Sequence, residues 1–186
     1  MLTLIAKLIF RCSGWTYEPR NSAWQQKQVV VGFPHTTNLD GVRSLALFKI
    51  YGIKVHTLVK KDLFVWPFSW FLNSFGCLPV DRNSRSNLVQ DLKQKFDEAE
   101  EFTLLIAPEG TRHKGDVPGP KPIKTGFWQI AKAAGVPIIL MISDARKKHG
   151  SMVGKIFPSD SIREDLIKLR DLYAPYGVMI DIGNQD

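Results

Sequence analysis

Short apolar runs alternate along the chain with stretches in which apolar residues recur every three or four positions. Continuous apolar runs are typical of buried strands, whereas the three-to-four spacing favours amphipathic helices. The runs that predict strands are residues 28–33, 53–59, 76–82, 102–107 and 136–142. The helical spacing covers residues 40–52, 84–100, 123–134 and a stretch that starts near residue 161. This alternation predicts an α/β layered domain with a mostly parallel central sheet flanked by helices.

Proline, glycine and serine mark where several of these elements begin and end. Pro34 ends the first strand because it lacks an N–H and has a fixed φ, and Gly52 is a natural helix stop. Ser161 and Glu164 have the spacing of a capping box, which predicts the start of the last helix. The chain has no internal repeat and no interdomain linker, so we expect residues 1–186 to form a single domain.

Two apolar segments do not fit a simple strand or helix of the core. The first ten residues, MLTLIAKLIF, are too few to cross about 30 Å of hydrocarbon, and no cleavage site of small residues follows them. Residues 1–12 are therefore either an interfacial helix or a terminal helix packed on the core. Residues 63–75 are strongly aromatic and favour either core packing or a surface that faces lipid or an acyl chain. The aromatic residues are Phe64, Trp66, Phe68, Trp70, Phe71 and Phe75.

Composition adds a preference for anionic partners. The chain has 25 Lys and Arg against 18 Asp and Glu, a formal charge of +7, and a basic turn formed by Arg146, Lys147 and Lys148. A basic protein favours phosphorylated substrates, acidic lipid surfaces or nucleic acid. Nucleic acid fits least, because the aromatic residues cluster in an apolar segment instead of alternating with basic ones. The two cysteines are far apart, so we expect no disulfide and a reduced cytosolic compartment.

A histidine and a carboxylate lie five positions apart directly after the first strand. His35 and Asp40 belong to the stretch PHTTNLD, which leads from that strand into a helix. A neutral imidazole can accept a proton near pH 7, and a carboxylate on its other nitrogen fixes the tautomer and stabilises the imidazolium. The alternative is that Asp40 caps the helix and His35 satisfies a backbone group. In open α/β sheets, ligands bind beyond the carboxyl ends of strands, where this stretch is expected.

Several common catalytic sites are absent from the sequence. It has no G-x-S-x-G, H-E-x-x-H or C-x-x-C motif and no phosphate-binding P-loop. Its four histidines have no metal-ligand spacing to one another. We therefore expect no metal and no organic cofactor.

Four blocks in order resemble the glycerolipid acyltransferase family, the lysophosphatidic-acid acyltransferase-like enzymes. His35 and Asp40 match its H-x-x-x-x-D block, and the resemblance extends over residues 29–142. The other three blocks are GCLPVDR at residues 76–82, APEGTR at 107–112 and VPIIL at 136–140. The chain departs from the family pattern at Pro34, Thr37 and Leu140, which leaves the acceptor open.

The resemblance implies a reaction and a set of site residues. His35, oriented by Asp40, is the base that deprotonates the acceptor hydroxyl, which attacks the thioester of acyl-CoA or acyl-carrier protein without an acyl-enzyme. The residues implied to bind the polar part of the acceptor are Arg82, Glu109, Gly110, Thr111, Arg112 and Lys124. Arginine forks match phosphate oxygens, but Arg82 beside Asp81 and Arg112 near Glu109 also allow local ion pairs.

The resemblance also implies the partners and the location of the protein. The expected acceptor is a lysophospholipid such as lysophosphatidic acid, at the inner face of the cell membrane, to which the cytoplasmic protein binds peripherally. Membrane contact would then rest on the first ten residues, the aromatic segment and the positive charge. Alternatives are transfer to another lyso-lipid such as an aminolipid, a non-catalytic domain that binds anionic lipid, and a thioesterase.

Overall fold

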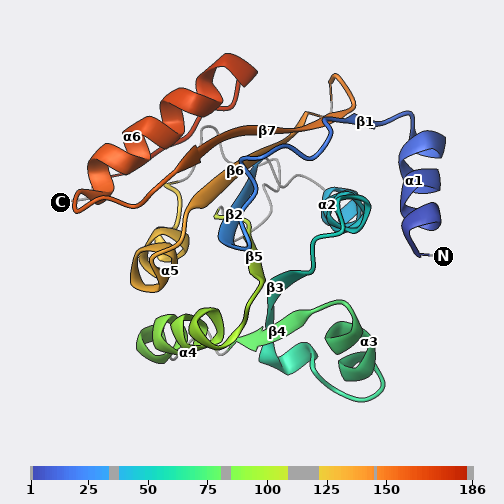
Figure 1. The fold of residues 1–186 in the computed structure, drawn as a ribbon, viewed down its shortest axis with the longest axis horizontal. Coiled ribbons are helices and arrows are strands. Elements are labelled where there is room, and N and C mark those ends of the chain that lie inside the picture. Colours follow the sequence, from blue (N-terminus) through green and yellow to red (C-terminus); the bar gives the residue numbers. More distant parts are fainter. Residues whose placement is uncertain (1, 34–37, 81–84, 109–121, 145, 184–186) are drawn as a thin grey trace.

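The computed structural model describes residues 2–33, 38–80, 85–108, 122–144 and 146–183 (Figure 1). Helices and strands alternate over much of this part of the chain. The strands are β1 (Thr16–Tyr17), β2 (Lys27–Phe33), β3 (Val55–Lys60), β4 (Cys77–Val80), β5 (Phe102–Ile106), β6 (Ile138–Asp144) and β7 (His149–Ile156). The α-helices are α1 (Leu2–Ser13), α2 (Asn38–Tyr51), α3 (Phe68–Ser74), α4 (Arg85–Glu98), α5 (Gly126–Ala134) and α6 (Ile162–Tyr173). Two short 3₁₀ turns are η1 (Lys61–Leu63) and η2 (Ala174–Tyr176).

The strands in the described residues form one sheet in the order β1-β7-β6-β2-β5-β3-β4. Every neighbouring pair is parallel except β6 and β7, which form an antiparallel pair. The predicted α/β class with a mostly parallel sheet is therefore confirmed. Strands β1 and β7 extend the sheet at one end and were not predicted from the sequence.

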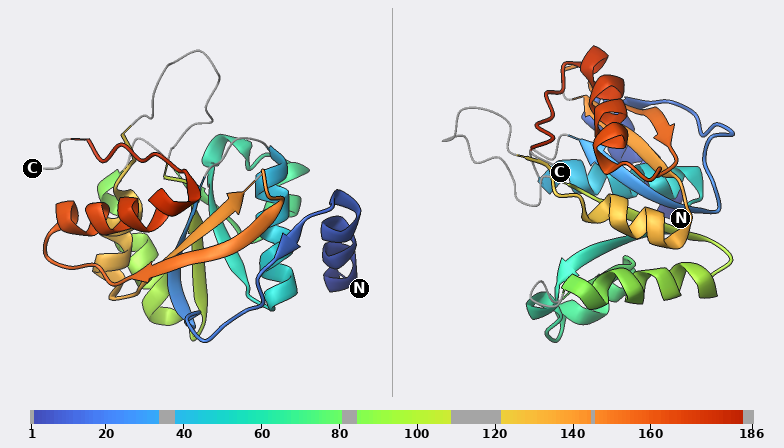
Figure 2. Two further views of the ribbon diagram at one scale, coloured as in Figure 1. Left: turned by 90° about the horizontal axis from the view of Figure 1, so that it is seen from above. Right: turned by 90° about the vertical axis from the view of Figure 1, so that its left-hand side faces the viewer.

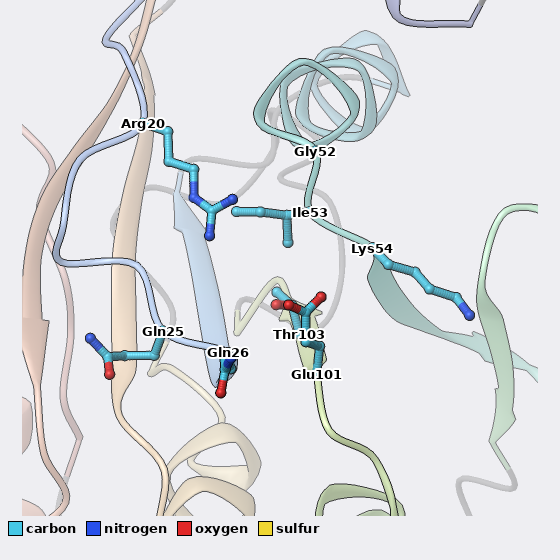
Figure 3. A pocket seen from close by; sticks show the side chains of 8 residues that line it. All are labelled: Arg20, Gln25, Gln26, Gly52, Ile53, Lys54, Glu101 and Thr103. Carbon is cyan, nitrogen blue, oxygen red and sulfur yellow. The ribbon is translucent and has the colours of Figure 1, made fainter.

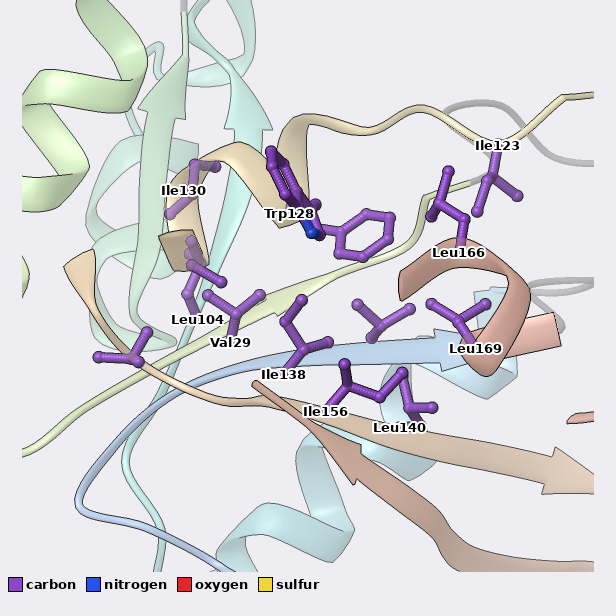
Figure 4. Close-up of a cluster of buried hydrophobic side chains, with 14 of the residues drawn as sticks. Val29, Leu104, Ile123, Trp128, Ile130, Ile138, Leu140, Ile156, Leu166 and Leu169 are labelled. Atoms are coloured by element: carbon purple, nitrogen blue, oxygen red, sulfur yellow. The ribbon is translucent and has the colours of Figure 1, made fainter. Parts of the chain in front are cut away.

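Helices cover both faces of the sheet. Figures 1 and 2 show α4, α5 and α6 on one side and α1, α2 and α3 on the other. Because successive side chains of a strand point to opposite faces, Val29 and Val31 of β2 join one hydrophobic cluster and Val30 joins the other. Figure 4 shows the first cluster, in which side chains of β2, β5 and β6 meet those of α5 and α6. Burial on both faces explains why the central strands are continuous apolar runs.

The N-terminal helix α1 packs on the domain with only one of its faces. Ala6 and Phe10 are buried against α2, whereas Leu4, Ile5 and Leu8 are exposed. The helix therefore packs on the core, as expected of a terminal helix of the domain. It also keeps an exposed apolar surface, as expected of an interfacial helix. Among the helices of the described ranges, none has the length and apolar character needed to cross a bilayer.

The aromatic segment between β3 and β4 lies largely at the surface. Trp66 and Trp70 are 88% and 74% exposed, and Phe75 is also exposed. The helix α3 begins directly after Pro67, as expected for a residue that breaks or begins helices. Core packing therefore does not account for the two tryptophans.

The last helix begins as its sequence predicts. The hydroxyl of Ser161 accepts a hydrogen bond from the main-chain N–H of Glu164 at 3.3 Å. This bond satisfies one of the amide groups that the first turn of a helix leaves without a partner, so the predicted start near Ser161 is confirmed.

Candidate functional site

The carboxyl ends of β2 and β5 lie side by side in the sheet. Val31 pairs with Ile106 in the parallel register, so β2 and β5 end at the same edge. From the end of β2 the chain continues through α2 to β3, which lies on the β5 side of β2. From the end of β5 it continues through α5 to β6, which lies on the opposite side of β2. Connections that diverge from neighbouring strands form a topological switch point, where open α/β sheets bind their ligands. We call the end of the sheet at which the parallel strands finish the carboxyl edge, and this carboxyl edge is the candidate site.

The first and third predicted blocks directly follow β2 and β5 in the sequence. Residues 34–37, with His35, follow Phe33 of β2, and residues 109–121 follow β5 and Pro108. The predicted site residues His35, Arg82, Glu109, Gly110, Thr111 and Arg112 lie outside the described residues. Their predicted roles therefore stay predictions.

Asp40 has a described backbone position in the first turn of α2. The helix begins at Asn38, two residues earlier, so Asp40 lies within the first turn and not at the capping position that precedes it. The two roles that the sequence allows for its side chain, orienting His35 or capping the helix, both stay predictions.

Lys124 is the predicted substrate-binding residue whose surroundings the structure describes. Its main-chain N–H donates to the carbonyl oxygen of Pro108 at 2.9 Å, and the residue is exposed. Ile123 beside it is buried and donates from its N–H to the carbonyl oxygen of Asp181 at 3.0 Å. The chain therefore returns after residue 121 to the point beside β5 from which it left, and Lys124 lies at the carboxyl edge.

The second predicted block is farther along the same edge. Residues 81–84, with Arg82, follow β4, which β3 and β5 separate from β2. At about 4.8 Å between neighbouring strands, β4 lies about 14 Å from β2. Of the two strands that lead to the second and third blocks, β5 is therefore the nearer to β2.

The opposite edge of the sheet has a small polar hollow of its own. It has a volume of about 50 Å³ and lies beside residues that precede β2, β3 and β5, at the amino ends of these strands (Figure 3). Its lining residues are Arg20, Gln25, Gln26, Gly52, Ile53, Lys54, Glu101 and Thr103. The hollow is therefore separate from the carboxyl edge.

His56 does not belong to the carboxyl edge either. It pairs in the sheet with Leu104, and its ring stacks on Phe102 with centroids 4.4 Å apart and planes 9° apart. Burial of the imidazole and the nearby charges of Lys54 and Lys95 lower the pKa of His56. The ring is therefore neutral near pH 7 and packs in the sheet. Among the described residues, no three His, Cys, Asp or Glu side chains form a group that could hold a metal ion.

A family model described as Acyltransferase matches residues 12–143. The chain belongs to this acyltransferase family. The resemblance inferred from the four sequence blocks is thereby confirmed.

Two curated relatives carry acyltransferase names. An uncharacterized acyltransferase of Schizosaccharomyces pombe is 29% identical over 118 residues, which are 62% of this chain and 41% of the relative. The 1-acyl-sn-glycerol-3-phosphate acyltransferase of Haemophilus influenzae is 36% identical over 87 residues, which are 45% of this chain and 35% of the relative. The match thus covers less than half the length of each of these curated relatives.

A solved structure has the same fold. The 1-acyl-sn-glycerophosphate acyltransferase from Thermotoga maritima superposes with a TM-score of 0.60 and 16% identity, over 97% of this chain and 80% of that one. At this identity the likeness establishes the α/β fold alone.

Two features of the carboxyl edge come from sequence beyond the part that matches the acyltransferase family. The ring of Tyr173, on α6, makes an edge-to-face contact with Phe33 at the end of β2, with centroids 5.1 Å apart. The turn after β6 carries Arg146, Lys147 and Lys148, all exposed. The carboxylate of Asp144 orders this turn by accepting from the N–H groups of Arg146 and Lys147 at 2.9 and 3.1 Å. The sequence signalled the turn by its three consecutive basic residues, but Tyr173 gave no signal beyond its place on an apolar helix face.

Proposed function

We propose that the chain is an acyltransferase that moves a fatty acyl group from acyl-CoA or acyl-carrier protein to the hydroxyl of a lysophospholipid such as lysophosphatidic acid. Membership of the acyltransferase family and the names of its relatives support this proposal. The observation that carries it is the adjacency of the ends of β2 and β5, because the first and third family blocks follow these two strands. Residues far apart in the sequence can thereby act on one substrate.

In the proposed mechanism, His35 is the general base and Asp40 orients it. His35 follows Phe33 by two residues in the sequence, while Asp40 is in the first turn of α2. His35 takes the proton of the acceptor hydroxyl, whose oxygen forms a bond to the thioester carbonyl carbon. The carbon–sulfur bond then breaks, and the thiolate leaves with a proton from the imidazolium. The acceptor oxygen is the nucleophile, so no acyl-enzyme forms.

The polar head of the acceptor is proposed to bind beside the base. Arg82, Arg112 and Lys124 supply positive charge for a phosphate, and arginine can bind two of its oxygens at once. Gly110 lets the backbone approach the ligand, while Glu109 and Thr111 bind glycerol hydroxyls. The main-chain bond from Lys124 to Pro108 supports this arrangement, because it holds Lys124 at the same strand end.

The reaction can be tested by release of free CoA. Purified protein with acyl-CoA should release CoA when lysophosphatidic acid is present, and His35→Ala should lower the rate by about a hundredfold or more. His149→Gln is the matched control and should leave the rate unchanged. Undiminished activity in His35→Ala would overturn the mechanism. Release of CoA without any acceptor would instead identify a thioesterase, and binding of anionic lipid without turnover would identify a non-catalytic domain.

The acceptor and the donor need a second experiment. We propose that turnover is fastest with lysophosphatidic acid and needs no metal or organic cofactor. A panel of lysophosphatidic acid, other lysophospholipids and lyso-aminolipids, each with acyl-CoA and with acyl-carrier protein, should rank the substrates. A faster rate with a lyso-aminolipid would reassign the acceptor while keeping the acyl transfer. Loss of activity after treatment with a chelator would contradict the proposed cofactor independence.

A further inference from the structure

An exposed apolar patch lies at the same edge of the sheet as the candidate site. We define this apolar patch as Leu63, Val65, Trp66 and Trp70, which are 56%, 56%, 88% and 74% exposed. The segment follows β3 from its carboxyl end, and Trp70 lies in the first turn of α3. Because β3 is the neighbour of β5, the apolar patch lies near the end of the strand that leads into the third family block.

Exposed lysines accompany the apolar patch along this edge. We define the basic rim as Lys60, Lys61, Lys124, Lys147 and Lys148, all of which are exposed. Lys60 ends β3, Lys124 is bonded beside the end of β5, and Lys147 and Lys148 follow β6. Among the described residues that follow these strand ends, Asp62 is the exposed acid and lies 3.6 Å from Lys60. The edge therefore combines tryptophans with an excess of positive charge.

We propose that the carboxyl edge docks on the surface of an anionic lipid bilayer. Trp66 and Trp70 enter the boundary between head groups and acyl chains, where tryptophan is enriched because its ring is apolar and its N–H polar. The basic rim contacts acidic head groups, to which clustered lysines are attracted within a Debye length. Both features border the candidate site, so the site opens onto the leaflet that holds the acceptor. This inference rests on the proposed function, because that function supplies the reason for the site to face lipid.

The exposed face of α1 is the competing membrane contact. Leu4, Ile5 and Leu8 are exposed there, in the first two turns of α1. It is the other end of α1 that leads to the basic rim, where the N–H of Thr16 donates to the carbonyl oxygen of Lys148 at 2.8 Å. Its neighbouring tryptophan, Trp15, is buried and cannot enter a bilayer in this structure. A contact through Leu4, Ile5 and Leu8 would be made at the end of α1 that lies away from the basic rim. The apolar patch is therefore the better candidate.

The first test measures binding to vesicles. Wild-type protein should bind vesicles of phosphatidylcholine and phosphatidylglycerol in a flotation assay. The affinity of the double variant Trp66→Ser, Trp70→Ser for these vesicles should be lower by at least about tenfold. Phe157→Ser is the matched control, because Phe157 is 62% exposed and follows the end of β7, at the opposite edge of the sheet. This control should bind like wild type. Equal losses in both variants, or a loss found only in Leu4→Ser, Leu8→Ser, would overturn the proposal.

The second test measures the contribution of charge. The double variant Lys61→Glu, Lys147→Glu should weaken binding to the anionic vesicles, and added salt should weaken binding of the wild type, because both reduce the attraction to acidic head groups. Lys54→Glu is the matched control, because Lys54 is exposed beside the amino end of β3. Equal binding to pure phosphatidylcholine vesicles and to the anionic ones would contradict the role of the basic rim.

A third measurement separates this inference from the proposed enzyme activity. The tryptophan double variant should keep wild-type turnover on a short-chain lysophosphatidic acid that stays monomeric, and lose turnover on an acceptor embedded in vesicles. Absence of turnover in the wild type with either acceptor would refute the proposed function, while the vesicle assay would still decide the docking surface. If the variant instead converted a dimer into a monomer and bound vesicles normally, the apolar patch would be an interface between copies of the chain and the proposal would be wrong.

Discussion

The hydroxyl of Tyr173 donates to the main-chain carbonyl oxygen of Val31 at 3.1 Å, although the two residues are 142 positions apart in the sequence. It also lies 2.8 Å from the carbonyl oxygen of Met141 on β6. Tyr173 is fully buried, and its ring contacts Phe33, the residue from which the chain leads into the His35 segment. The last helix therefore holds the ends of β2 and β6 directly beneath the candidate site.

The variant Tyr173→Phe tests this support. It keeps the ring and removes the hydroxyl, so the buried carbonyl oxygens of Val31 and Met141 lose a donor. The free energy of unfolding should fall by about 1–3 kcal/mol, as measured by urea titration. If Tyr173 also positions the segment after Phe33, the kcat for acyl transfer should fall while the acceptor KM changes little. Tyr176→Phe, three residues further on, is the control. An unchanged kcat in a destabilised Tyr173→Phe protein would limit Tyr173 to a structural role.

Asp165 gives a prediction for the pH dependence of stability. This buried carboxylate accepts hydrogen bonds from Trp128 Nε1 at 2.9 Å, from the N–H of Ser159 at 2.6 Å and from Lys168 Nζ at 3.3 Å. Burial alone would raise the pKa of Asp165, but these donors outweigh it and lower the pKa overall. Because the pKa of Asp165 is lower in the folded state, ionisation of this group stabilises the fold at pH values above the pKa of the unfolded state, which is about 3.9 for aspartate.

The contribution of Asp165 to stability should therefore be complete at neutral pH and disappear as the pH falls from about 4 through the lower pKa of the folded state. Urea titrations of wild type and Asp165→Asn at pH 7 should differ by about 1–3 kcal/mol, and the difference should shrink at acid pH. The exposed Asp171 provides the control Asp171→Asn, for which little change is expected. A difference between wild type and Asp165→Asn that stays constant with pH would show that ionisation of Asp165 does not stabilise the fold.

The central elements could be predicted because local and tertiary preferences agree there. Residues 28–33 form an apolar run, and β2 is buried on both faces. Ser161 and Glu164 have capping-box spacing, and the bond between them begins α6. Where the local sequence preference and the tertiary packing do not agree, the sequence was less informative about the structure. Strand β7 mixes buried and partly buried positions without a regular pattern and contains Gly150, Gly154 and the exposed Lys155, so its sequence lacks a continuous apolar run.

The candidate site could be predicted only in part from the sequence. The spacing of His35 and Asp40 after a strand indicated one edge of a sheet, but the order of the strands depends on which way each connection crosses. The adjacency of β2 and β5 became visible only in the fold. The sequence also did not determine which aromatic side chains are exposed, because a segment such as that around Trp66 can pack into the core or face solvent with the same residues.

The strand order predicts unequal roles for the two arginines. Arg112 follows β5, the direct neighbour of β2, whereas Arg82 follows β4, two strands further along. Arg112→Ala should raise the apparent KM for lysophosphatidic acid by about 10- to 100-fold, the cost of losing a hydrogen bond to a charged group. Arg82→Ala should have a smaller effect, and Glu109→Gln should also raise this KM far less than Arg112→Ala. Equal increases in the donor and acceptor KM for Arg112→Ala would argue against phosphate binding.

Asp40 provides the sharpest test of the proposed base. Asp40→Asn keeps the size of the side chain but can no longer stabilise an imidazolium on His35. The kcat of this variant should fall by about a hundredfold or more. In the wild type, kcat/KM should fall on the acid side as the proposed base takes up a proton. Loss of the carboxylate disfavours the charged imidazolium, so a more acidic solution is needed to protonate His35. The acid limb of the Asp40→Asn profile should therefore shift to lower pH.

The Asp40→Asn variant also decides between a catalytic and a structural aspartate. Because Asp40 lies in the first turn of α2, replacing its charge weakens its interaction with the helix dipole, which is worth only about 0.3–1 kcal/mol. A urea titration should therefore show a small loss of stability beside a large loss of kcat. If the loss of activity were as small as the loss of stability and the pH profile did not move, Asp40 would serve the helix alone and His35 would lack the partner that the proposed mechanism requires.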